Sequence, residues 1–242
     1  MKNAARRHYE KEEYVLNAES YAKEVKAKRE ETVNKYVSTE TISLLELGCG
    51  SGILKSLRSN WVGLDISSSA LKRARPSSVI TCDIQNMPIR DRAVGAIASF
   101  NTLEHIQNPE ETLEECCRVL LPGGVLVFQE SWFCEVLRLH SVGLARKIAI
   151  GVRRLARELI LSLGVKNLKL RFRKISPNYG IIGEDWDAVS SIDPHDMLCW
   201  FKSREYIPLN EADKLLLRCL SREPFKNEDR ALAVRKPSAS PS

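Results

Sequence analysis

ISLLELGCGSGIL, residues 42–54, is the stretch that decides the fold. An apolar run ends at Leu47, and three glycines follow within five residues, at positions 48, 50 and 52. This order predicts a strand, a tight turn and then a short helix, which we expect over residues 53–59. Glycine permits the bend and the close approach of a ligand, and the free N–H groups of the helix would point at that ligand. The turn therefore predicts a binding loop for a polar, nucleoside-sized molecule.

A second acidic group follows the next apolar run, residues 61–64. That run ends in Asp65, nineteen positions after Glu46. At the end of a second strand a carboxylate can accept hydrogen bonds from both hydroxyl groups of a ribose. Glu46 would repel a pyrophosphate, and Ile53 stands where dinucleotide-binding turns carry a third glycine. The ligand is therefore expected to be cationic or zwitterionic, and a nucleotide-dependent oxidoreductase is the weaker alternative.

Five segments resemble, in order and spacing, the class I S-adenosylmethionine-dependent methyltransferases, namely LLELGCGSG, VGLDIS, CDIQNMP, FNTLEHI and RVLLPGG. The resemblance covers residues 42 to about 130 and is strongest to the branch that includes quinone-biosynthesis methyltransferases. It implies an α/β fold, a doubly wound and mostly parallel seven-stranded sheet. Residues 231–235 would enter that sheet as an antiparallel edge strand. It also implies that S-adenosylmethionine is the cofactor.

The same resemblance assigns the donor-binding residues. Glu46 and the glycine loop would hold the methionine moiety, Asp65 the ribose, and Asp83 with Ile84 the adenine. Asp83 could instead cap the turn after its strand. The full expected set is Glu46, Gly48, Gly50, Gly52, Asp65, Ile66, Asp83, Ile84 and Asn101.

Three residues are candidates for catalysis. His105 follows the predicted fourth strand, residues 93–100, where substrate and donor should meet. It could take a proton from the acceptor, or it could be a structural histidine of the loop. Tyr179 and His195 lie in a polar, acidic stretch of the kind that lines acceptor pockets in similar enzymes. Tyr179 could equally be a loop aromatic, and His195 an exposed residue in the first turn of a helix that begins after Asp193.

The basic character of the chain is concentrated in one segment. The whole chain has a net charge of +6, yet residues 138–174 contain eleven Lys and Arg residues and one acid, Glu158. Apolar residues interleave with the arginines, which predicts helices with an apolar face and a cationic face. The segment could be a solvated basic cover packed on the core, a surface for anionic lipid, or an RNA-binding patch, which its few aromatic residues disfavour.

The composition is that of an ordinary globular protein, with 43% hydrophobic and 28% charged residues among 242. We expect a cytoplasmic protein, because the amino terminus lacks a signal-peptide core and no run could span a bilayer. Seven scattered cysteines without a CxxC pair predict reduced thiols and no metal site. The expected organisation is a helical segment (1–40) that docks on the domain or covers the donor as a lid, a methyltransferase domain (41–130 and 181–236), a basic helical insertion (131–180) and a disordered tail (237–242).

The predicted function is methyl transfer from S-adenosylmethionine to a small-molecule or lipid-like acceptor. An RNA methyltransferase is the alternative enzyme. A methyltransferase-like protein that binds the nucleoside without chemistry is the alternative outside enzymes. Methyl transfer from a sulfonium depends chiefly on positioning, and it needs a base only if the acceptor must lose a proton. The sequence therefore leaves the acceptor atom open.

Overall fold

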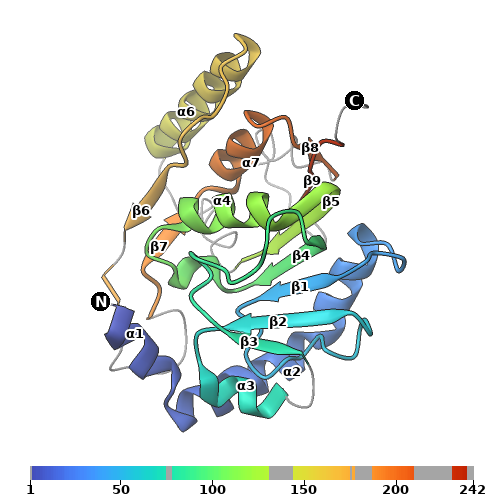
Figure 1. Cartoon of the computed structure of the whole chain (residues 1–242). Coiled ribbons are helices and arrows are strands. Elements are labelled where there is room, and N and C mark those ends of the chain that lie inside the picture. Colours follow the sequence, from blue (N-terminus) through green and yellow to red (C-terminus); the bar gives the residue numbers. More distant parts are fainter. Residues whose placement is uncertain are drawn as a thin grey trace.

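The computed structural model describes residues 2–74, 78–130, 144–174, 176–177, 187–209 and 231–238 (Figure 1). The helices are α1 (Lys2–Tyr9), α2 (Glu12–Tyr36), α3 (Ser68–Ala74), the 3-10 helix η1 (Leu103–His105), α4 (Pro109–Val119), α6 (Leu144–Ser162) and α7 (Pro194–Lys202). The strands are β1 (Leu44–Leu47), β2 (Trp61–Asp65), β3 (Val79–Thr81), β4 (Val94–Phe100), β5 (Leu120–Gln129), β6 (Phe172–Lys174), β7 (Ser190–Ile192), β8 (Ile207–Pro208) and β9 (Leu232–Arg235).

Seven strands form one sheet in the order β3-β2-β1-β4-β5-β9-β8. The pairs from β3 to β5 are parallel, whereas β9 is antiparallel to both β5 and β8. The strand order reverses between β1 and β4, as in a doubly wound fold, so the predicted fold class is confirmed. The expectation that β9 forms the edge was wrong, because the two-residue strand β8 pairs with its outer side.

Alternate residues of the strands feed two hydrophobic cores, one on each face of the sheet. Leu45 and Leu47 of β1 belong to the core that includes residues of α4 and α7. Leu44 belongs to the core that includes Val33 of α2 and Leu71 of α3. Because side chains alternate along a strand, Glu46 shares the α2 face with Leu44. This alternation places an acidic group between the sheet and the amino-terminal helices.

The junction of α1 and α2 is fixed onto the start of α3. Glu10 accepts hydrogen bonds from the backbone N–H groups of Ser68 (2.8 Å) and Ser69 (3.0 Å), and the Ser67 hydroxyl donates to the Tyr9 carbonyl (2.8 Å). Ser67 also caps the start of α3, since its Oγ accepts a hydrogen bond from the Ala70 N–H (3.2 Å). The amino-terminal segment therefore docks on the domain near the carboxyl end of β2.

Helix α6 turns its arginines inward and its apolar residues outward. Arg154 and Arg157 are 1% and 6% exposed, whereas Val152, Leu155 and Leu159 are 60–64% exposed. Arg154 pairs with Asp193 (2.8 Å), and Arg157 pairs with Asp196 (3.0 Å) at the start of α7. The expectation of a solvated basic cover was wrong for these arginines, because the acids of α7 neutralise them within the fold.

Three local features of the structure were not predicted. Residues 53–59 form turns rather than the expected helix, because the eight residues between Gly52 and Trp61 must also reverse the chain. Strand β5 begins at Leu120, so the Pro-Gly-Gly sequence lies inside it. The hairpin of β6 and β7 was not predicted, because strands of three residues carry too short a pattern. Within the described residues, no helix is long and apolar enough to cross a membrane.

Candidate active site

The predicted site residues come together because parallel strands end at the same edge of the sheet. Leu47 of β1 is in register with Leu64 of β2 and Ser99 of β4, and Phe100 pairs with Gln129 of β5. The residues that follow these strands therefore lie side by side. They include the glycine loop, Asp65, Asn101 and Glu130, at the point where the strand order reverses.

The glycines of the loop after β1 have different roles. All three have positive φ angles, +60° at Gly48, +53° at Gly50 and +71° at Gly52. A Cβ at Gly48 would lie 2.3 Å from Thr102 Oγ1, and a Cβ at Gly52 would lie 2.9 Å from Ala74 Cβ. A Cβ at Gly50 would meet nothing within 4 Å. Gly48 and Gly52 are therefore required by packing, whereas the backbone at Gly50 faces open space.

Asp65 holds the glycine loop in place. One of its oxygens accepts a hydrogen bond from the Gly50 N–H (2.8 Å), and the other accepts from the Ser67 N–H (2.8 Å). Burial raises the pKa of Asp65 against these hydrogen bonds, which lower it. Each carboxylate oxygen can accept a second hydrogen bond. Asp65 can therefore support the loop and also receive hydroxyl groups of a ligand.

Glu46 lies beneath the loop in a buried, charged environment. It is 1% exposed and accepts a hydrogen bond from Trp61 Nε1 (2.8 Å). Burial raises the pKa of Glu46 to about 7, although the Trp61 hydrogen bond and the positive charge of Arg29 oppose this rise. Arg29 of α2 is itself 9% exposed, and its guanidinium lies 5.2 Å from the centre of the Phe100 ring. No local sequence pattern singles out Arg29, which lies in a helix of mixed charge.

The other predicted donor residues lie along the same edge. Asp83 accepts hydrogen bonds from the backbone (3.0 Å) and the side chain (3.0 Å) of Gln85, so it does cap the turn after β3. Ile84 next to it is 5% exposed, and Ile66 next to Asp65 is half-buried. Asn101 has a φ of +53°, a conformation that asparagine tolerates better than most residues.

Glu130 directly follows β5 and faces η1. It accepts hydrogen bonds from the Ser99 hydroxyl (2.6 Å) and the Thr102 N–H (2.6 Å). Burial first, and then the negative charge of Glu104, raise the pKa of Glu130 to about 8. Two buried carboxyl groups thus lie together, and Glu130 is mainly neutral at pH 7.

His105 lies in a group of polar and aromatic side chains. Its Nδ1 atom is 3.4 Å from Asp187 Oδ2, and His8 Nε2 is 3.7 Å from the same oxygen. The ring of Tyr9 lies 6.0 Å from the His105 ring, edge to face. Residues after Asp187 are attached to η1, since the Val189 N–H donates to the Glu104 carbonyl (2.7 Å). An imidazole beside a carboxylate can accept a proton. Helix α1 supplies His8 and Tyr9 to this group, and the sequence did not single them out.

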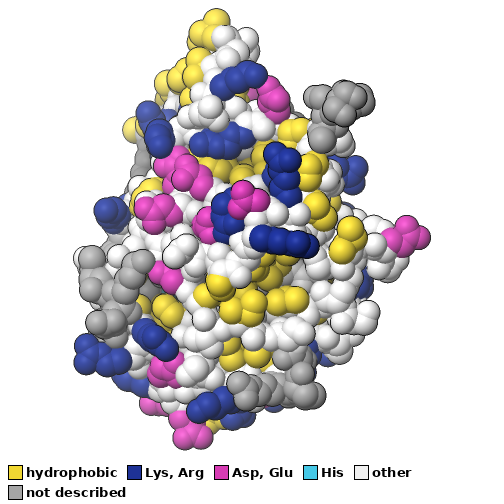
Figure 2. Space-filling model, in the orientation of Figure 1, with side chains coloured by type: hydrophobic (Ala, Val, Ile, Leu, Met, Phe, Trp, Pro, Cys, Tyr) yellow, Lys and Arg dark blue, Asp and Glu magenta, His cyan; other side chains and the backbone are white. Residues whose placement is uncertain are grey.

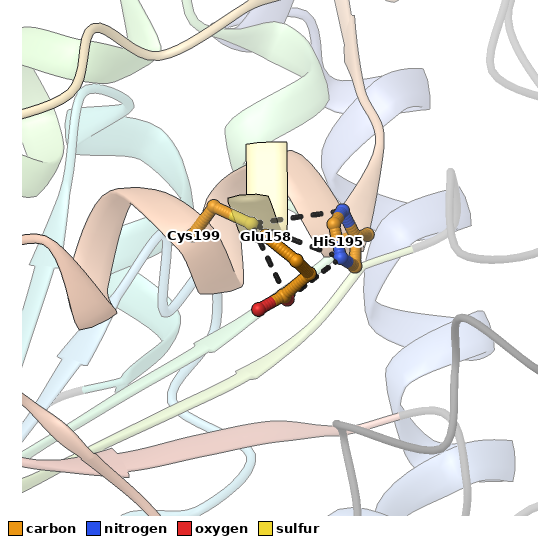
Figure 3. A group of neighbouring side chains, drawn as sticks. All are labelled: Glu158, His195 and Cys199. Atoms are coloured by element: carbon orange, nitrogen blue, oxygen red, sulfur yellow. Dashed lines mark hydrogen bonds and ion pairs between the residues drawn. The ribbon is translucent and has the colours of Figure 1, made fainter. Parts of the chain in front are cut away.

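His195 belongs to a different group, which joins α6 to α7 (Figure 3). It is 1% exposed, so the expectation of an exposed residue in the first helical turn was wrong. Its Nε2 lies 3.0 Å from Glu158 Oε1, and Cys199 Sγ lies 3.8 Å from the same oxygen. The His195 hydrogen bond lowers the pKa of Glu158 to about 2, and burial raises the pKa of Cys199 to about 12.

These three ligand atoms lie within 4.8 Å of one another, a spacing that could hold a metal ion. The Lys202 ammonium, however, lies 3.5 Å from Glu158 Oε2, where it neutralises the carboxylate. The group therefore acts as an ionic link between the two helices. The contacts of this group run between α6 and α7, away from the contacts of His105 described above, and Tyr179 lies outside the described residues.

Comparison with known proteins gives the fold a family context. Residues 45–128 match the family model described as "Methyltransferase domain". A malonyl-[acyl-carrier protein] O-methyltransferase of Coxiella burnetii is 38% identical over 80 residues, 33% of this chain and 28% of that protein. A ubiquinone biosynthesis O-methyltransferase of Chromobacterium violaceum is 28% identical over 118 residues, 43% and 51% of the two chains. The Bos taurus protein named "Probable tRNA methyltransferase 9B" is 30% identical over 104 residues, 40% and 23% of the two. The chain thus spans about half or less of these relatives.

Solved structures agree over almost the whole chain. An S-adenosylmethionine-dependent methyltransferase of Thermotoga maritima has a TM-score of 0.54 at 16% identity, covering 96% of this chain and 98% of that one. The [4+2]-cyclase SpnF has a TM-score of 0.51 at 15% identity, covering 88% and 82%. At such identities the likeness concerns the fold. The chain therefore has the α/β methyltransferase fold, and its residues 45–128 match the methyltransferase domain, for which S-adenosylmethionine is the methyl donor.

Proposed function

We propose that this chain transfers a methyl group from S-adenosylmethionine to a small-molecule or lipid-like acceptor. The observation that carries the proposal is the edge of the sheet at which β1, β2 and β4 end. There the backbone at Gly50 faces open space and donates a hydrogen bond to Asp65, and His105, 3.4 Å from Asp187, follows the neighbouring strand β4. In this proposal the donor would bind beside the glycine loop, and His105 would be the proton acceptor near it.

The charges at this edge match a zwitterionic donor. The methionine part of S-adenosylmethionine carries an ammonium and a carboxylate group. Glu46 would receive the ammonium, and Arg29, which faces Glu46 across the α2 side of the sheet, would receive the carboxylate. Asp65 and Ile66 would contact the ribose, Asp83 and Ile84 the adenine, and Asn101 the region of the transferred methyl group.

The chemistry requires little beyond positioning. S-adenosylmethionine, when bound, would supply a methyl carbon on a sulfonium, and the electron pair of that carbon–sulfur bond would stay on sulfur as the acceptor atom bonds to the carbon. If the acceptor atom carries a proton, His105 would take it, with Asp187 orienting the imidazole. Tyr179 and His195 stay secondary candidates for catalysis. The hydrogen bond between His195 and Glu158 favours a structural role for His195.

Two relatives and the contacts of α6 bear on the class of acceptor. The ubiquinone biosynthesis relative favours a quinone-like acceptor, whereas the tRNA relative of similar identity favours RNA. Arg154 and Arg157 are engaged by acids of α7, so they are poorly placed to bind the phosphates of an RNA. We therefore favour the small-molecule or lipid-like acceptor and keep the RNA methyltransferase as the alternative.

The test is incubation of the full chain with cell extract and donor labelled in its methyl group. We expect label in the small-molecule or lipid fraction, and we expect His105→Gln to lower the rate at least about tenfold while donor affinity stays unchanged. Glu111→Gln, on the exposed side of α4, is the matched control. Label in RNA would establish the alternative, and donor binding without label in any fraction would establish a binding protein without chemistry.

A further inference from the structure

The exposed face of α6 is an uninterrupted apolar stripe. Residues three or four positions apart lie on one side of a helix, and five apolar residues at such spacings are strongly exposed. They are Ile148 (54%), Val152 (63%), Leu155 (64%), Leu159 (60%) and Leu163 just beyond the helix (74%). Figure 2 shows hydrophobic side chains at the upper end of the molecule, where Figure 1 places α6. A helix normally turns such a stripe toward the core of its own domain.

Ionic contacts hold the stripe outward. Arg153 and Arg154 both bond to Asp193, at 2.6 and 2.8 Å, and Arg157 pairs with Asp196 at 3.0 Å. Glu158 continues the same side of α6 to His195 and Lys202 (Figure 3). To turn the apolar residues inward, the helix would have to break all these pairs and leave buried charges without partners. The orientation of α6 is therefore fixed by its polar face.

Basic side chains follow the stripe along the chain. After Leu163 the chain returns beside α6, where Arg157 donates a hydrogen bond to the Lys169 carbonyl (3.2 Å). Four exposed basic residues lie on this return, Lys169, Arg171, Arg173 and Lys174. Lys166 is also exposed but pairs with Glu205 at 2.6 Å. Among the described residues, no ion pair neutralises these four basic side chains. An apolar stripe followed by basic side chains matches a bilayer surface, where anionic headgroups cover apolar acyl chains.

We propose that α6 and the basic return, residues 148–174, form a docking surface for an anionic lipid bilayer, on which the helix lies in the plane of the interface. The stripe would enter the boundary between headgroups and acyl chains, and the basic side chains would contact the anionic headgroups. A helix of 19 residues with a charged inner face suits such a position and does not suit crossing the bilayer. If the bilayer also supplies a lipid-like acceptor to the active site, that part of the inference rests on the proposed function. Binding of the chain to vesicles does not depend on it.

The test is flotation of the full chain with vesicles of phosphatidylcholine alone or with added phosphatidylglycerol. We expect binding to the anionic vesicles and its weakening by salt. Leu155→Gln with Leu159→Gln should lower binding at least about tenfold, because both substitutions remove apolar surface from the interface. The matched control is Ile42→Gln, at a 73% exposed position outside the stripe.

Charge is tested separately with Arg171→Glu and Arg173→Glu, against Lys72→Glu and Arg90→Glu at exposed positions elsewhere. Each basic residue near an anionic surface contributes about fivefold, so the first pair should reduce binding far more than the second. Circular dichroism and calorimetric binding of S-adenosylhomocysteine to each variant establish that the fold and donor site are intact. The proposal is refuted if the wild-type chain does not bind anionic vesicles. RNA binding, or a dimer that Leu155→Gln with Leu159→Gln dissociates, would then identify what occupies this surface instead.

Discussion

Replacing Glu130 with Gln tests whether the carboxyl group after β5 is held in its neutral form. Burial and Glu104 raise the pKa of Glu130 from 4.5 to about 8, against the hydrogen bonds from Ser99 and Thr102. A carboxyl group whose pKa is higher in the folded than in the unfolded state stabilises the fold at acid pH. That stability is lost as the pH rises from the unfolded to the folded pKa.

The size of the effect follows from the two pKa values. Each unit of difference corresponds to about 1.4 kcal/mol. The titration of Glu130 should lower the free energy of unfolding by about 2 kcal/mol between about pH 5.5 and 7, and by about 1 kcal/mol more up to about pH 9. Gln resembles the neutral carboxyl group and does not titrate, so the variant should lack this part of the pH dependence.

Urea unfolding of the wild type, Glu130→Gln and Glu111→Gln over this pH range provides the measurement. Titrating groups that do not interact with Glu130 cancel in the difference between wild type and variant. The remaining difference belongs to the coupled pair of Glu130 and Glu104, and it should change with pH by about the amounts given above. Glu111 is exposed on α4, and its substitution should leave the pH dependence as it is. Parallel curves for wild type and Glu130→Gln would refute the reasoning.

The remaining predictions concern the donor loop and the position of α6. Donor affinity should rise about tenfold from about pH 6 to 8 as Glu46 ionises around its pKa of about 7, and calorimetry with Glu46→Gln should show no such rise. Gly48→Ala should lower the free energy of unfolding by at least about 2 kcal/mol, because its Cβ would overlap Thr102. Gly50→Ala should lower it by less but should weaken donor binding. Equal losses for the two variants in urea unfolding would contradict this prediction. Asp193→Ala should lower the free energy of unfolding by about 3 kcal/mol and speed hydrogen exchange in α6, because it removes the ionic partner of the buried Arg154. Unchanged exchange would argue against the ionic attachment of α6.

The sheet and the donor edge could be predicted because local signals coincide with the fold. Two local signals identify the strands: the apolar run before the glycines, and the acids or amides directly after strands. Parallel pairing then brings the ends of these strands together at one edge of the sheet. The contact between Glu46 and Trp61 could not be predicted. It depends on the register of β1 against β2, in which Glu46 lies opposite Gly63.

The orientation of α6 shows what periodicity leaves undecided. The spacing of its residues defined an apolar face and a cationic face, but nothing local indicates which face turns inward. That choice depends on Asp193 and Asp196, about 40 residues further along the chain. The same long-range contacts bury His195, which its helix-start position alone had suggested to be exposed. Charges far apart in sequence decided both outcomes.

A crystal structure of the full chain grown with S-adenosylhomocysteine tests the central claim most directly. We predict that the ribose hydroxyl groups lie within hydrogen-bond distance of Asp65, that the backbone at Gly50 contacts the ligand, and that the ligand's ammonium group lies beside Glu46. A nucleoside bound away from the ends of β1 and β2, or one that leaves Asp65 and Glu46 without contact, would contradict the account.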